Sequence, residues 1–139
     1  MELYEIIDKL TDKMTEMVRA EKIKLIGQEE LEKISYGSFR ALEVVANSDE
    51  ATISSIAKAL RITKASASVA VRKMEKEGLV YREQSSEDKR VYFIRMAEKG
   101  KAVKQGEVNS LKRMGRYIES KLSEEEARNF KEYMIKLLK

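Results

Sequence analysis

The residues of this sequence that are best suited to chemistry are basic, and their surplus lies C-terminal to Leu60, equally in residues 61–100 and in residues 101–139. Residues 61–100 hold ten Lys and Arg against six Asp and Glu, whereas residues 1–35 hold six against nine. The chain has no Cys and no His, which excludes thiolate sites and removes both the commonest general base and the usual zinc ligands. A local basic excess suits a polyanionic partner. The composition therefore favours binding over catalysis.

Residues 61–100 contain an amphipathic helix, which the spacing predicts over residues 63–77. Thr63 is its expected N-cap, and the helix is expected to end at Gly78. Its inward face is apolar and holds Ala67, Ala70, Val71 and Met74. Its outward face is small near the N-terminus and basic toward the C-terminus, and holds Ala65, Ser68, Val69, Arg72, Lys73 and Lys76. This pattern suits a helix that enters the major groove of DNA. An ordinary solvated face would have the same polarity.

The flanking elements would position this helix. A short helix precedes it, with Ile56, Ala57 and Leu60 inward and Ser54 as the expected cap, and a tight turn at residues 61–62 joins the two. A β-hairpin over residues 79–96 follows, because strand-like runs at 79–82 and 91–96 flank a polar tip at residues 84–89. Two cations lie at this tip, within the run Asp88, Lys89, Arg90. An Arg there suits a narrow minor groove.

The run from Ser54 to Gly100 resembles the DNA-binding core of the MarR family of transcriptional regulators. The resemblance rests on Ile56-Ala57, on Met74-Glu75-Lys76-Glu77-Gly78-Leu79-Val80, on Asp88-Lys89-Arg90 and on Ala97-Glu98-Lys99-Gly100. It implies a homodimer with interlocked terminal helices, whose reading helices face successive major grooves through Lys64, Ser66, Ser68, Val69 and Arg72. It also implies that Arg90 enters the minor groove and that Asp88 orients it. Three positions depart from the family: Val69 stands where many members have Arg, Ser85 where Asp is frequent, and Ala97 where Thr is usual.

Long apolar stripes mark the predicted dimerisation helices at residues 1–34 and 101–139. One helix runs to about Ile26 and stops at Gly27, another begins near Glu98, and Ser123 with Glu126 forms a capping box for the last. One small core is too little to bury all of these stripes, so we expect a second copy to cover Leu3, Ile6, Ile7, Leu10, Leu111, Met114, Ile118, Phe130, Met134 and Leu137. The alternative is that they pack on the chain's own winged region.

The expected fold is mainly α with a small β-hairpin wing, in a single domain over residues 1–139. Residues 35–100 form the winged helix-turn-helix, and the dimerisation helices flank it. The resemblance places a small-molecule effector crevice near Met17, Tyr36 and Phe39. No cofactor is expected, and the acidic runs at residues 29–32 and 124–126 suit helix N-termini better than a metal. No apolar run is long enough to span a bilayer, so we expect a cytoplasmic protein without a membrane partner.

These observations predict a sequence-specific regulator of transcription that binds double-stranded DNA and is not an enzyme. We expect a homodimeric repressor on a pseudo-palindromic operator, modulated by an effector that the sequence does not identify. The alternative is a winged-helix protein-interaction module without a DNA target. The two differ in salt dependence, since only DNA binding should depend steeply on salt.

Overall fold

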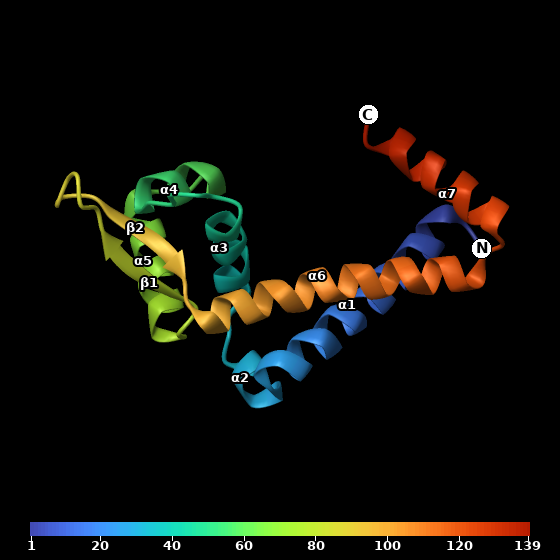
Figure 1. Cartoon of the computed structure of the whole chain (residues 1–139), viewed down its shortest axis with the longest axis horizontal. Coiled ribbons are helices and arrows are strands. Elements are labelled where there is room, and N and C mark those ends of the chain that lie inside the picture. Colours follow the sequence, from blue (N-terminus) through green and yellow to red (C-terminus); the bar gives the residue numbers. More distant parts are fainter. The chain divides into compact units, whose positions relative to one another are not determined.

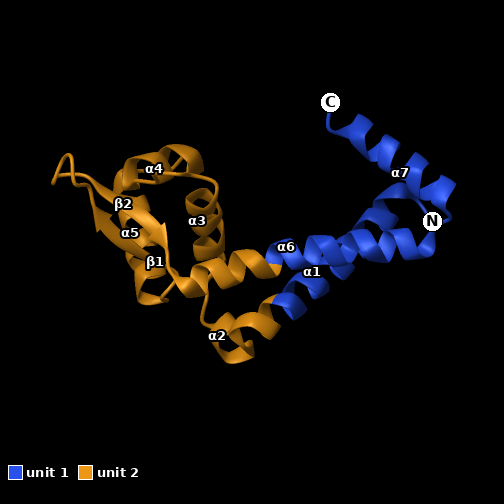
Figure 2. Cartoon of the chain, in the orientation of Figure 1, with its two compact units in different colours: residues 1–21, 107–139 blue, residues 22–106 orange.

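The computed structural model describes all residues 1–139, and it is mostly helical with one antiparallel hairpin (Figure 1), as predicted. The elements in chain order are α1 Leu3–Ile26, α2 Gln28–Glu32, α3 Tyr36–Ala46, α4 Ile53–Leu60, α5 Lys64–Lys76, β1 Val80–Gln84, β2 Tyr92–Met96, α6 Glu98–Lys121 and α7 Glu124–Leu137. The chain divides into two compact units (Figure 2), residues 22–106 and residues 1–21 with 107–139. None of the helices combines the length and apolar composition of a membrane span.

The core of residues 22–106 lies where α3, α4 and α5 pack together and the hairpin closes over them. Its largest fully buried side chains are Ile56, Val71, Met74, Leu79, Ile94 and Val103. Burying one such side chain contributes roughly 1.5–3 kcal/mol. These contacts hold α5 by its apolar side and leave its other face in solvent.

Side-chain caps set where the helices of this unit begin. Thr63 Oγ1 accepts a hydrogen bond from the Ser66 backbone N–H at 3.1 Å, so the predicted cap of α5 is confirmed. The predicted cap of α4 is wrong, because Thr52 and Ser55 form a reciprocal capping box and Ser54 lies inside the first turn. Helix α4 therefore begins at Ile53.

Helix α2 was not expected from the sequence. It is only five residues long, follows Gly27 at φ 83°, and carries Glu29 and Glu30 in its first turn. Acidic residues are favourable at a helix N-terminus because of the helix dipole. The acidic run at residues 29–32, which was interpreted as ordinary charge at a helix N-terminus, was therefore the only sequence signal of this helix.

The wing begins with a sharp change of direction after α5. Gly78 adopts a left-handed φ of 76°, and the Leu79 N–H then bonds to the Met74 carbonyl at 2.9 Å. Strands β1 and β2 pair antiparallel from Val80 opposite Met96 to Gln84 opposite Tyr92, so β1 extends two residues beyond the predicted run.

The far side of β2 and the start of α6 tie the wing to the rest of the unit. The Ile94 N–H bonds to the Ala51 carbonyl at 2.7 Å, so Ala51, two residues before α4, adds a bridge to the hairpin. The Ala97 N–H bonds to the Leu79 carbonyl at 2.9 Å. A Cβ at Gly100 would lie 2.2 Å from that same carbonyl oxygen, so only glycine lets α6 pack this closely.

The unit formed by residues 1–21 and 107–139 leaves most of its apolar side chains exposed. Of the ten residues assigned to dimerisation, Met114 is buried and Ile118 is half-buried. The other eight are exposed, namely Leu3, Ile6, Ile7, Leu10, Leu111, Phe130, Met134 and Leu137. Helix α7 has no buried residue, although its Ser123–Glu126 capping box forms as predicted. Its apolar stripe is not buried within one chain.

Candidate nucleic-acid interface

Helix α5 presents one uncovered face, and the side chains lie on it as the helical wheel predicts. Ala67, Val71 and Met74 are fully buried on the core side. The outward residues are exposed except for half-buried Ser68, and comprise Lys64, Ala65, Ser66, Ser68, Val69, Arg72, Lys73 and Lys76. Val69 keeps 56% of its surface exposed, so an apolar side chain stands in the middle of a polar face. Such a face can make both apolar and polar contacts.

The cations of this face are not neutralised. Lys64, Arg72, Lys73 and Lys76 take part in no ion pair, whereas the single acidic residue on the helix body, Glu75, pairs with Arg82 at 2.8 Å. A free cation on a solvated face keeps its full attraction for a polyanion. The face is therefore electropositive.

The tip of the wing holds one arginine in a defined orientation. The Asp88 carboxylate accepts hydrogen bonds from Arg90 Nε at 3.1 Å, from Arg90 Nη2 at 3.0 Å and from the Arg90 backbone N–H at 3.0 Å. The side-chain bond from Arg90 is the main reason that the pKa of Asp88 lies below its ordinary value, and the same bond raises the pKa of Arg90. The Arg90 side chain is still 90% exposed. Asp88 therefore fixes both the backbone and the guanidinium of Arg90, while most of the side chain stays in contact with solvent.

Local hydrogen bonds shape the rest of the tip. Ser85 Oγ accepts from the backbone N–H groups of Glu87 at 3.2 Å and Asp88 at 3.3 Å. This is the turn-forming contact that an Asp side chain also makes, so Ser85 serves well at a position where the MarR family often has Asp. Gln84 Nε2 bonds to the Lys89 carbonyl at 2.8 Å, which leaves the Lys89 side chain exposed.

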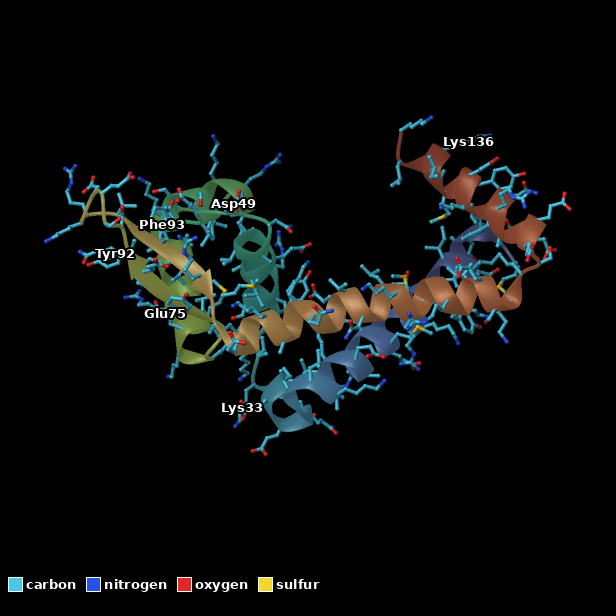
Figure 3. All side chains as sticks on the ribbon, in the orientation of Figure 1. Lys33, Asp49, Glu75, Tyr92, Phe93 and Lys136 are labelled. Carbon is cyan, nitrogen blue, oxygen red and sulfur yellow. The ribbon has the colours of Figure 1, made fainter.

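Two further arginines fix the wing to its surroundings, and sequence reasoning missed both. Arg82 on β1 pairs with Glu75 on α5 at 2.8 Å. Arg95 on β2 pairs with Glu83 at 3.0 Å and also bonds to the backbone carbonyl of Asp49. Glu75 and Asp49 lie on either side of the hairpin (Figure 3), so the wing is tied to α5 and to the loop before α4.

A family model matches part of this chain. Residues 34–92 match the model of the MarR family. Residues 34–92 are a MarR-family domain. A search of curated protein sequences found no match.

Solved structures extend the MarR-type fold to nearly the whole chain. A MarR-like transcriptional regulator from Thermotoga maritima is 25% identical, with a TM-score of 0.74, over 99% of this chain and 95% of that one. S. aureus MepR in a DNA complex is 24% identical (TM-score 0.73; 98% of this chain, 95% of that one). Streptococcus pneumoniae FabT, also in complex with DNA, is 23% identical (TM-score 0.66; 99% and 95%). The last two support the fold alone.

The residues expected at an effector crevice are spread over both units. Tyr36 and Phe39 lie on α3 of the MarR-family domain, Tyr36 exposed and Phe39 half-buried beneath the Lys22 ammonium, 4.3 Å from the ring centre. Met17 belongs to the other unit. A cavity of about 310 Å³ beside α3 is lined by other residues, including Arg40, Leu60, Ile62 and Lys73. The effector site therefore stays a prediction.

Proposed function

We propose that this chain is a DNA-binding transcription regulator that acts as a homodimeric repressor. The observation that carries the proposal is the set of four unpaired cations on the outward face of α5, beside a wing tip that projects Arg90 from Asp88. The MarR-family domain supports it, as do the DNA complexes of MepR and FabT, which have the same fold.

Helix α5 would read the major groove. Ala65 is small enough to let the backbone approach the base edges, and the hydroxyls of Ser66 and Ser68 are suited to hydrogen bonds there. Val69 would contact the methyl group of a thymine, because its side chain is apolar. The Arg that many MarR-family members have at this position would instead bond to guanine. Arg72 would bond to a guanine or a phosphate, and Lys64 and Lys73 would bind phosphates.

The wing would contact the adjacent minor groove through Arg90, with Lys89 close to the backbone. A narrow minor groove has an enhanced negative potential that favours an inserted Arg. Because Asp88 already orients the guanidinium, less conformational entropy is lost when Arg90 binds. The wing would thus add affinity and a preference for A·T-rich sequence.

A second copy would place two such heads on one operator. The exposed apolar stripes of α1, α6 and α7 would form the dimer contact, and two-fold symmetry would match a pseudo-palindromic site. Half-sites one helical turn apart require the two α5 helices about 34–36 Å apart. A dimer bound over a promoter would block transcription, and an effector that changes this spacing would release it.

The test is fluorescence anisotropy of the protein with duplex DNA from upstream of its own gene and with a scrambled duplex, over 50–200 mM salt. We expect selective binding and a loss of affinity of about 10³–10⁵ over this range if roughly 6–10 phosphates are contacted. Arg72→Ala and Arg90→Ala should each weaken binding, whereas Lys131→Ala on α7 is the matched control for lost charge. An affinity that is equal for the two duplexes and does not change with salt would contradict the proposal.

The second candidate function is a protein-interaction module, which the exposed apolar faces of α1 and α7 favour. Its binding would rest on apolar contacts, so it would change little with salt and would survive Arg72→Ala. The absence of binding to duplex DNA even at low salt would support this alternative.

A further inference from the structure

A notch lies between the start of α4 and the base of the wing, entirely within residues 22–106. It is open to solvent and has a volume of about 320 Å³, and its polar lining side chains are Thr52, Ser54, Arg82, Arg90 and Tyr92. Tyr92 is the first residue of β2, at the end of the strand that is nearest the wing tip (Figure 3). Of these residues only Arg90 belongs to the interface predicted from the sequence.

The side chains that line the notch offer hydrogen-bond donors and include no carboxylate. The carboxylates of Glu75 and Asp88 pair with its two arginines but are not lining residues. Arg82 uses its Nε to bond Glu75 at 2.8 Å, and its terminal nitrogens donate no hydrogen bond within the chain. Arg90 bonds Asp88 through Nε and Nη2, which leaves Nη1. Ser54 Oγ has no hydrogen-bond partner, and Tyr92 accepts a bond from Gln84 Nε2 at 3.4 Å while its own hydrogen remains. Such a set of donors suits an anion with acceptor oxygens only.

The position of the notch between two DNA-contacting elements indicates which anion this is. If α5 lies in a major groove and Arg90 in the neighbouring minor groove, one phosphodiester strand separates the two grooves and must pass between these elements. The notch lies along that path, because Arg90 forms one wall and Arg82, tied to α5 through Glu75, forms another. This step rests on the proposed function.

We propose that the notch binds one phosphate of this strand, with Arg82 and Ser54 as its main ligands. Arg82 is held by Glu75 and presents its terminal nitrogens to the phosphate oxygens, while Ser54 donates its hydroxyl from the first turn of α4. Tyr92 adds a third donor from β2. A phosphate held here sets the register of α5 and the wing together and carries no sequence information.

The first experiment replaces single phosphates of the operator by neutral methylphosphonates, one linkage at a time. In the wild-type protein we expect the replacement at one linkage between the two grooves to lower affinity by about tenfold, since it removes one charge-assisted contact. Arg82→Gln should be insensitive at that linkage and keep the wild-type response elsewhere. Its salt slope should be smaller by about one. An unchanged pattern of sensitive linkages in Arg82→Gln would overturn the proposal.

Two further variants separate contact from folding. Glu75→Gln removes the ion pair but keeps the Arg82 charge, so it should retain the sensitive linkage. Ser54→Glu puts a carboxylate into the notch and should weaken binding to operator and scrambled duplex alike. Gln28→Glu on α2 adds the same charge in the same unit, outside the interface, and should have little effect. If Glu75→Gln loses the linkage as Arg82→Gln does, Arg82 acts only by holding the wing.

The outcomes also distinguish this proposal from the function on which it rests. A wild-type protein that binds no duplex DNA would overturn both. Selective wild-type binding, with the same sensitive linkages in wild type and Arg82→Gln, would overturn the phosphate site alone.

Discussion

The two compact units differ in how far they bury their apolar side chains. Residues 22–106 bury Ile56, Val71, Met74 and Leu79 completely, and the exposed face of α5 is mostly polar and basic. In residues 1–21 and 107–139, Met114 is the only buried apolar side chain, and α7 buries none. Residues 22–106 complete their core within one chain, whereas residues 1–21 and 107–139 present an uncovered apolar surface, which we propose a second copy covers. Mutations should therefore affect the two units through different measurable quantities.

The largest expected effect is on the core of the MarR-family domain. Met74→Ala should lower the free energy of unfolding by roughly 2–5 kcal/mol, because it leaves a cavity among fully buried neighbours. Chemical denaturation followed by circular dichroism measures it. Met134→Ala, on a half-exposed methionine of α7, is the matched control and should cost far less in the isolated chain. Equal losses of unfolding free energy in Met74→Ala and Met134→Ala would contradict this difference between the two units.

The second effect concerns association rather than folding. Phe130→Glu should convert the proposed dimer into a monomer at micromolar concentration, because it buries an unpaired charge at the expected contact. Sedimentation velocity gives the mass, and circular dichroism should show that helix content is kept. Lys131→Glu changes charge at the neighbouring position and should leave the dimer intact. A dimer that persists in Phe130→Glu would argue against α7 as part of the contact.

A smaller effect is expected at the turn between α4 and α5. Arg61 adopts a left-handed backbone with φ 55°, which is unfavourable for a residue with a Cβ. Arg61→Gly should therefore raise the stability of this unit by about 0.5–1 kcal/mol, after the greater flexibility of glycine in the unfolded chain is counted. Arg40→Gly, in the middle of α3, should instead lower stability by about 1 kcal/mol. Thermal unfolding compares them, and a destabilised Arg61→Gly would contradict the argument.

The smallest effect is the pH response of the wing tip. Because its bonds to Arg90 depress the pKa of Asp88 in the folded chain, the stabilisation they provide is present above the ordinary pKa of aspartate. It is lost only as the pH falls through the depressed value. DNA affinity should thus show no titration of Asp88 between about pH 5 and 8, where aspartate is already ionised. A carboxyl carbon NMR titration checks this, and an ordinary or raised pKa for Asp88 would refute it.

Local patterns predicted most of the MarR-family domain. The spacing of Ala67, Val71 and Met74 gave the correct inward face of α5, and Thr63 gave its cap. Two errors were also local. The helix α2 is too short to show periodicity. Ser54 was predicted as the cap of α4, but Thr52 caps it, because the reciprocal bonds between Thr52 and Ser55 satisfy two backbone groups at once.

The sequence by itself determined which segments other than α2 are helices and strands, which face of α5 is basic and where α5 and the wing begin. These properties depend on residues within a few positions of one another, so periodicity and caps reveal them. Only the tertiary structure decided that Glu75 holds Arg82, that the Asp49 carbonyl receives Arg95, and that Ser54 faces a notch with Tyr92. Those contacts join different elements, and their geometry depends on how the helices and the hairpin pack around the shared core.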